Sequence, residues 1–105
     1  MANTFKSSGL SNISANSTIY TVPAATQTTA IGLVVANKTQ GTVTANVAVG
    51  RSGNVYYIVQ QAQIVTGSSL VAIGGDQKVV LQAGDNVYIS ASANVDSWIS
   101  VLEIS

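Results

Sequence analysis

Residues 42–60, TVTANVAVGRSGNVYYIVQ, hold two extended segments joined by a turn. From Thr42 to Val49 the odd-numbered positions are apolar and the even-numbered ones are mostly polar, which is the period of a strand with one buried face. The next five residues, Gly50 to Asn54, include two glycines and an asparagine, which favour the positive φ of a tight reversal. Val55 to Gln60 is therefore predicted to pair back on the first segment as a β-hairpin.

The rest of the chain repeats this pattern and contains no credible helix. Valine, isoleucine and threonine are abundant, and these residues fit a pleated strand better than a helix. Further strands are predicted near residues 4–7, 18–22, 30–36, 69–73, 78–94 in two halves, and 98–104. About eight short strands separated by Gly and Asn turns predict an all-β fold, a single antiparallel β-sandwich of jelly-roll-like or immunoglobulin-like type. A closed small barrel is the alternative.

Charge is scarce in this chain of 105 residues. Charged residues make up 8% of it and hydrophobic residues 47%, whereas about a quarter of a typical soluble domain is charged. The surface must therefore be largely Ser, Thr, Asn, Gln and Ala, which suits a subunit of an assembly. The length predicts one domain. We expect residues 1–17 to form a polar arm that orders against a neighbouring molecule, and residues 18–105 to form the sandwich.

Composition excludes most catalytic chemistry. The chain has no His and no Cys, which removes histidine bases, thiol nucleophiles and zinc sites built from these residues. The four carboxylates, Asp76, Asp85, Asp96 and Glu103, are expected to have structural roles, since Asp favours turns through its local hydrogen bonds. We therefore expect no catalytic residues, no metal site, no cofactor and no enzymatic activity.

The formal net charge is zero, so neither nucleic acid nor an anionic membrane is an expected partner. Met1 to Leu10 lacks the charged start and apolar run of a signal peptide. The longest apolar stretch, Ala30 to Ala36, is far shorter than the roughly 20 residues that a membrane-spanning helix needs. We expect the protein to act in the compartment where it is made or assembled.

The strands predicted near residues 30–36 and 98–104 are apolar on both faces, although a two-layer sandwich buries only one face of each sheet. The second apolar face implies a partner surface, such as another copy of the chain. The residues predicted for this interface on these strands are Ile31, Leu33, Val34, Val35, Trp98, Ile99 and Val101.

Tyr56 and Tyr57 are added to the predicted interface because exposed tyrosines favour binding surfaces. An alternative is that these rings, with nearby Asn and Gln side chains, bind carbohydrate. They could also simply pair across strands.

Several segments in their chain order resemble a known group of proteins. These segments are Met1 to Lys6 (MANTFK), Tyr20 to Pro23 (YTVP), Ile31 to Asn37 (IGLVVAN), Gly74 to Leu81 (GGDQKVVL) and Ser100 to Ile104 (SVLEI). The chain resembles the small virion structural proteins of tailed bacteriophages, particularly those infecting cyanobacteria. This resemblance implies a non-enzymatic homo-oligomer that contacts other virion proteins on the capsid, neck or tail, within a particle assembled in the host cytoplasm. The alternative within this setting is a host-carbohydrate-binding module of a tail tip or fibre.

Overall fold

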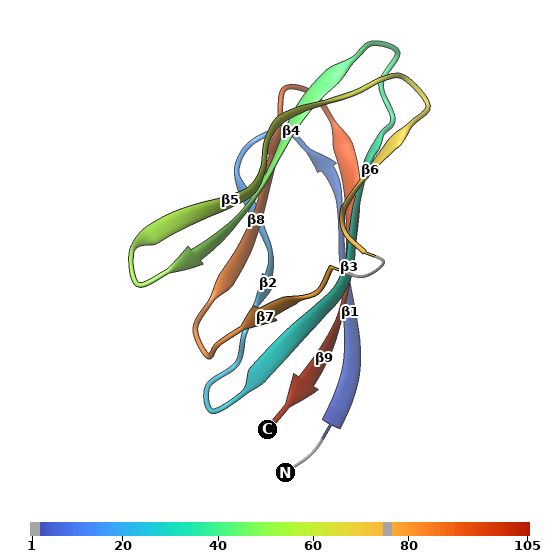
Figure 1. Cartoon of the computed structure of the whole chain (residues 1–105). Helices are drawn as coiled ribbons and strands as arrows, with labels where there is room; N and C mark the ends of the chain where they lie inside the picture. The colour runs from blue at the N-terminus through green and yellow to red at the C-terminus, as the bar shows by residue number, and fades with distance from the viewer. Residues whose placement is uncertain (1–2, 75–76) are drawn as a thin grey trace.

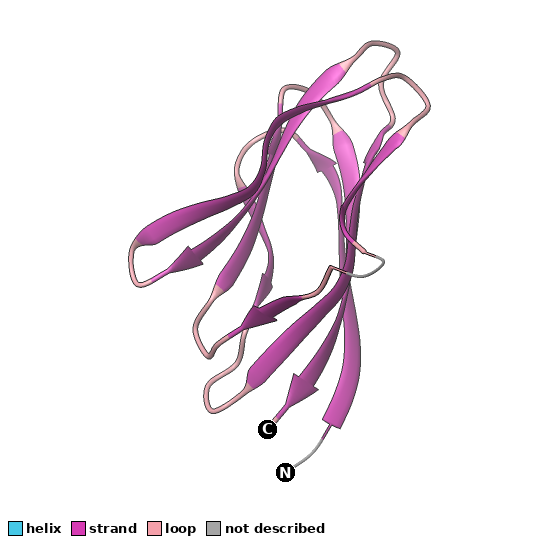
Figure 2. Ribbon diagram, viewed as in Figure 1, coloured by secondary structure: helices cyan, strands magenta, loops and turns pink. Residues whose placement is uncertain are grey.

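The computed structural model describes residues 3–74 and 77–105, and these residues form nine strands and no helix (Figure 2). The strands are β1 (Asn3–Ile13), β2 (Ser17–Thr21), β3 (Gln27–Asn37), β4 (Val43–Arg51), β5 (Asn54–Ile64), β6 (Ser69–Ile73), β7 (Val79–Leu81), β8 (Asn86–Ala91) and β9 (Val95–Ile104). They build two antiparallel sheets that pack as a sandwich, so the predicted fold class is confirmed.

One sheet has five strands in the order β1-β9-β3-β6, with β7 also paired to β3, and the other has four in the order β2-β8-β4-β5. Strands adjacent in sequence therefore often lie in different sheets (Figure 1). The start of β1 and the C-terminus lie at the same end of the molecule (Figure 1). The closed-barrel alternative is wrong for the described strands, because no strand of one sheet pairs with a strand of the other.

The predicted hairpin is strands β4 and β5, and its loop is tighter than the sequence suggested. Arg51 pairs with Asn54, which leaves only Ser52 and Gly53 as the turn. Both turn residues have positive φ, 54° and 83°, as a two-residue hairpin turn matching the right-handed strand twist requires. On β4 the alternating residues Val43, Ala45, Val47 and Val49 are buried, as their period predicted.

The core lies between the two sheets and is built from the inward faces of both. Its most completely buried large side chains come from β3, β4, β6, β7, β8 and β9 and from the segment after β2. They are Val22, Leu33, Val35, Val43, Val47, Ile73, Leu81, Val87, Ile89, Val95, Ile99 and Val101. One continuous apolar layer therefore holds the sheets together, without disulfides.

The N-terminal segment differs from expectation. Residues 3–13 of the expected polar arm form β1, which pairs antiparallel with β9 from Asn3 opposite Ile104 to Leu10 opposite Ser97. Most of its side chains are exposed, so β1 is held mainly by backbone hydrogen bonds to β9. A polar sequence does not reveal such pairing, because the stabilising groups are the N–H and C=O that every non-proline residue carries.

Strand β9 begins at Val95, earlier than the start near residue 98 that the sequence predicted. Val95 is buried in the core, and Ser97 faces inward with its hydroxyl donating to the carbonyl oxygen of Val34 at 2.7 Å. Because this hydrogen bond to the neighbouring strand satisfies the Ser97 hydroxyl, the serine can face inward and the strand continues through it.

Leu33 and Val34 are adjacent residues on β3 that face opposite sides of the sheet. Leu33→Ala should lower the free energy of unfolding by about 2–5 kcal/mol, because it leaves a cavity in the core. The matched control Val34→Ala removes partly exposed atoms and should cost no more than about 1 kcal/mol. Urea denaturation of both variants tests this, and equal losses would contradict the assignment of the core face.

Candidate assembly face

Strands β3 and β9 are neighbours in the five-stranded sheet and carry seven of the nine residues predicted for an interface. Four of the seven, Leu33, Val35, Ile99 and Val101, have 0–1% of their surface exposed. They belong to the core between the sheets, which corrects their assignment to an accessible face.

Ile31 lies apart from Leu33 and Val35, although simple alternation places the three on one face. The pairing of β3 with β9 shifts register between Ala30 and Gly32, so Ile31 is the extra residue of a β-bulge. Ala30 before the shift and Leu33 after it both point into the core. The bulge therefore moves Ile31 out of the core layer, and it is half-buried.

The outward face of this sheet carries a row that crosses four strands, with apolar side chains on three of them. Trp98 on β9 lies opposite Gly9 on β1 and Val34 on β3, and Val34 lies opposite Val71 on β6. A β-carbon built on Gly9 would be 2.5 Å from Cε3 of Trp98, so the absence of a side chain at Gly9 gives the indole its place. The Trp98 side chain is nevertheless 54% exposed, which leaves much of its apolar surface facing solvent.

A second row crosses the same face. Leu102 on β9 lies opposite Phe5 on β1 and Thr29 on β3, and Thr29 lies opposite Val80 on β7. Phe5 is 76% exposed and Val80 59%. Sequence reasoning missed Phe5, Val71 and Val80 because their apolar neighbours come from other strands.

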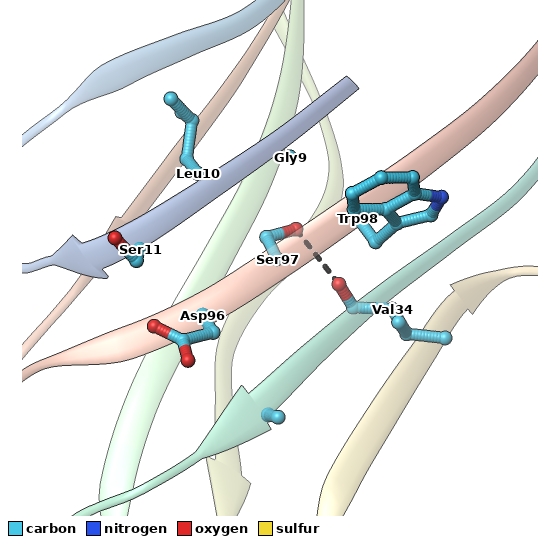
Figure 3. A pocket seen from close by; sticks show the side chains of 8 residues that line it. Gly9, Leu10, Ser11, Val34, Asp96, Ser97 and Trp98 are labelled. Carbon is cyan, nitrogen blue, oxygen red and sulfur yellow. Dashed lines mark hydrogen bonds between the residues drawn. The ribbon is translucent and has the colours of Figure 1, made fainter. Parts of the chain in front are cut away.

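We call the apolar side chains of the two rows, together with the bulge residue Ile31 that lines a hollow with Phe5, the Trp98 face. Its members are Phe5, Ile31, Val34, Val71, Val80, Trp98 and Leu102. Figure 3 shows one hollow of this face, where Trp98 and Asp96 of β9 lie between Gly9 of β1 and Val34 of β3. Among the outward strand residues of this sheet that the structure describes, only Asp96 is charged. It lies at one end of the face and pairs with Lys38 at 3.2 Å. The face is therefore uncharged away from this end, and Ser100, which lies opposite Ser7 on β1 and Gly32 on β3, separates the two apolar rows.

Tyr56 and Tyr57 are placed on β5, the edge strand of the other sheet, where they line a hollow together with Val80 of β7. They are 58% and 55% exposed and point to opposite sides of β5. Tyr57 lies opposite Ala48, and Tyr56 lies opposite the buried Val49. The residues predicted as one interface are thus divided among the core, the Trp98 face and the β5 edge.

The buried carboxylate of Asp85 links three parts of the chain. It accepts two hydrogen bonds from the guanidinium of Arg51 and one from the backbone N–H of Gln82. The Arg51 hydrogen bonds lower the pKa of Asp85 below its ordinary value, although burial opposes them. The backbone carbonyl of Asp85 also accepts from the N–H of Val22 at 2.9 Å. Asp85 therefore fixes the turn between β7 and β8 against the end of β4 and the segment after β2.

Glu103 faces inward on β9 and is 7% exposed. It accepts a hydrogen bond from the Tyr20 hydroxyl and pairs with Lys6 of β1 at 3.0 Å. The Tyr20 hydrogen bond lowers the pKa of Glu103, burial opposes it, and the hydrogen bond and charge of Lys6 lower it further. Burial and the hydrogen bond to Glu103 raise the pKa of Tyr20 to about 12. This cluster joins β1, β2 and β9 across the two sheets.

The described carboxylates thus have structural partners, as expected from the sequence. Asp96 accepts the backbone N–H of Asn12, which lowers its pKa. Asp76 lies outside the described residues. Within residues 3–74 and 77–105, no three acidic side chains gather as metal ligands would, and there is no helix that could span a membrane.

Comparisons with known proteins add information on the fold. No family model and no curated protein matches the chain. A solved structure described as "Bacillus endospore appendages form a novel family of disulfide-linked pili" contains a chain with a similar fold, at a TM-score of 0.54 and 16% sequence identity. The similarity covers 99% of this chain and 87% of that chain. At this identity the likeness shows a shared fold and no more.

The lowered pKa values of Asp85 and Glu103 predict loss of stability in acid. Unfolded Asp and Glu titrate at about pH 3.9 and 4.3. Above those values the folded carboxylates therefore make their full contribution to the free energy of unfolding. It is lost as the pH falls through the lower folded pKa values. Asp85→Asn should reduce the free energy of unfolding at pH 7 and flatten its decline between about pH 5 and pH 2.

Urea denaturation across this pH range measures the effect, and Asp96→Asn is the control. Asp96 pairs at the surface, where its side chain is 47% exposed, and such pairs contribute little. An unchanged pH profile in Asp85→Asn would contradict the role given to the Arg51–Asp85 pair.

Proposed function

We propose that this protein is a non-enzymatic structural subunit of a bacteriophage virion that associates through its Trp98 face. The carrying observation is that five of the large apolar side chains exposed by the chain, Phe5, Val34, Val71, Val80 and Trp98, lie on the outward face of one sheet. Contiguous exposed apolar patches mark interaction sites. The resemblance to virion proteins supports a role in a phage particle. The low content of charged residues supports burial of the subunit surface within that particle.

Energetics set how much of the face must be covered. A standard interface buries about 1,600 Å² in total, somewhat over half of it apolar, which at about 25 cal/mol per Å² corresponds to about 20 kcal/mol. Association costs about 4–15 kcal/mol in lost freedom, before side-chain ordering. A partner must therefore cover most of both apolar rows, which favours another flat sheet surface over a short peptide.

Contacts between copies would be non-covalent, because the chain has no cysteine. The pili in the comparison are described as disulfide-linked. Partners of the face are copies of this chain and other virion proteins, in a decoration, cement or accessory role on the capsid, neck or tail. The role needs no cofactor.

Association can be measured by light scattering of the purified protein over a hundredfold concentration range. We expect an oligomer that persists in moderate salt, since an apolar interface is insensitive to charge screening. Trp98→Glu should dissociate it, because the interface would bury an unpaired charge.

Thr18→Glu is the matched control, because Thr18 is exposed on the other sheet, opposite Tyr88. This variant should retain the wild-type mass. A monomer at every concentration, or equal masses for wild type and Trp98→Glu, would contradict self-association through this face.

A further inference from the structure

The outward face of the four-stranded sheet contains a hollow of a different character from the Trp98 face. Its volume is about 430 Å³, within the roughly 300–1,000 Å³ typical of small-molecule sites. Its lining combines aromatic rings with neutral polar groups from three strands and the segment before β2. The lining residues are Asn16, Asn46, Ala48, Val55, Tyr57, Tyr88 and Ser90.

Two tyrosines flank a floor of small residues. Ala48 on β4 lies opposite Tyr57 on β5 and Tyr88 on β8, so two strand spacings place the tyrosine Cα atoms about 10 Å apart. A β-carbon on the adjacent floor residue Gly50 would be 2.6 Å from Cε2 of Tyr88. The missing side chain at Gly50 therefore lets the Tyr88 ring lie down across β4, and Ala48 keeps the space between the rings open.

Several polar groups of the hollow are held in place by the protein. Asn46 accepts a hydrogen bond from the backbone N–H of Gln61 at 2.7 Å and donates one to the Ser90 hydroxyl at 3.1 Å. The Tyr88 hydroxyl accepts from the Asn86 amide at 3.3 Å. This arrangement presents pre-oriented donors and acceptors.

Other polar groups of the hollow are open to a ligand. Within the described part of the chain, the Asn16 amide and the Tyr57 hydroxyl form no hydrogen bond with protein groups. Both can therefore donate to and accept from a bound molecule.

The lining contains no charged side chain, which restricts the ligand. An anionic or cationic ligand would lose hydration without gaining a counter-charge, and a nucleic-acid backbone would find no basic residue. A neutral ligand suits this lining if it has both apolar C–H faces and hydroxyl groups. The C–H faces would pack on the tyrosine rings, and the hydroxyl groups would hydrogen-bond with the side-chain amides and hydroxyls.

We propose that this hollow binds a neutral saccharide between Tyr57 and Tyr88. The site lies on the sheet opposite to the Trp98 face, so a subunit attached through the Trp98 face leaves it open to solvent. Saccharide binding is therefore independent of self-association, and one can fail without the other.

The test uses the full chain on an array of neutral and acidic glycans, followed by calorimetric titration of a neutral oligosaccharide that binds. The titration is carried above about 1 mM glycan, so that a Kd of up to about 1 mM is detected. Tyr57→Ala should weaken binding at least about tenfold, because it removes one wall of the hollow. Tyr56→Ala is the matched control, since Tyr56 is equally exposed on the other side of the same strand. It should leave the Kd within about twofold.

Asn16→Ala provides a second variant, outside the strands, in case Tyr57→Ala alters folding by circular dichroism. It should also weaken binding, and Trp98→Glu should bind as the wild type does. The proposal is overturned if no neutral glycan binds at about 1 mM, or if only acidic glycans bind. Loss of binding in Tyr56→Ala with none in Tyr57→Ala and Asn16→Ala would also overturn it.

Discussion

The antiparallel pairing of β3 with β9 is the contact on which the rest of the structure depends. Both strands are apolar on both faces, so either face is chemically fit for the core. Their register places Leu33 opposite Ile99 and Val34 opposite Trp98, which aligns one apolar layer inward and the other outward. A slip of one residue would exchange the two layers. The bulge at Ile31 keeps both halves of β3 in phase with β9, which has no bulge in this pairing.

The same pairing leaves the other edge of β9 free for β1. The N-terminal strand adds little to the core, but it contributes Phe5 to the Trp98 face and the bare backbone of Gly9 beneath the indole. It also carries Lys6, which pairs with Glu103 on the inner side. A polar segment therefore completes both the apolar outer surface and a partly buried ionic cluster, because pairing through the backbone is largely independent of side-chain type.

The two outward faces of the sandwich differ in chemistry. The Trp98 face is apolar and almost uncharged, which suits burial against another protein surface. The face containing Tyr57 and Tyr88 is neutral, polar and hollowed, which suits a small hydrated ligand. The core between the sheets, the Arg51–Asp85 pair and the Tyr20–Glu103 hydrogen bond hold these faces on opposite sides of one body. Such a subunit can be fixed on one side and exposed on the other.

The sequence by itself determined the local features: the all-β class, the β4–β5 hairpin, the buried face of β4 and the excess of apolar surface, because strand period and turn chemistry depend on near neighbours. It did not separate Leu33, Val35, Ile99 and Val101 from Val34 and Trp98, and it placed residues 1–17 outside the sandwich. Only the tertiary structure decided these points. They depend on the partner strand and its register, and on a bulge that reverses the alternation within β3. Phe5, Val71 and Val80 join Trp98 because three further strands pair beside β9 and β3; their chain positions carry no sign of this.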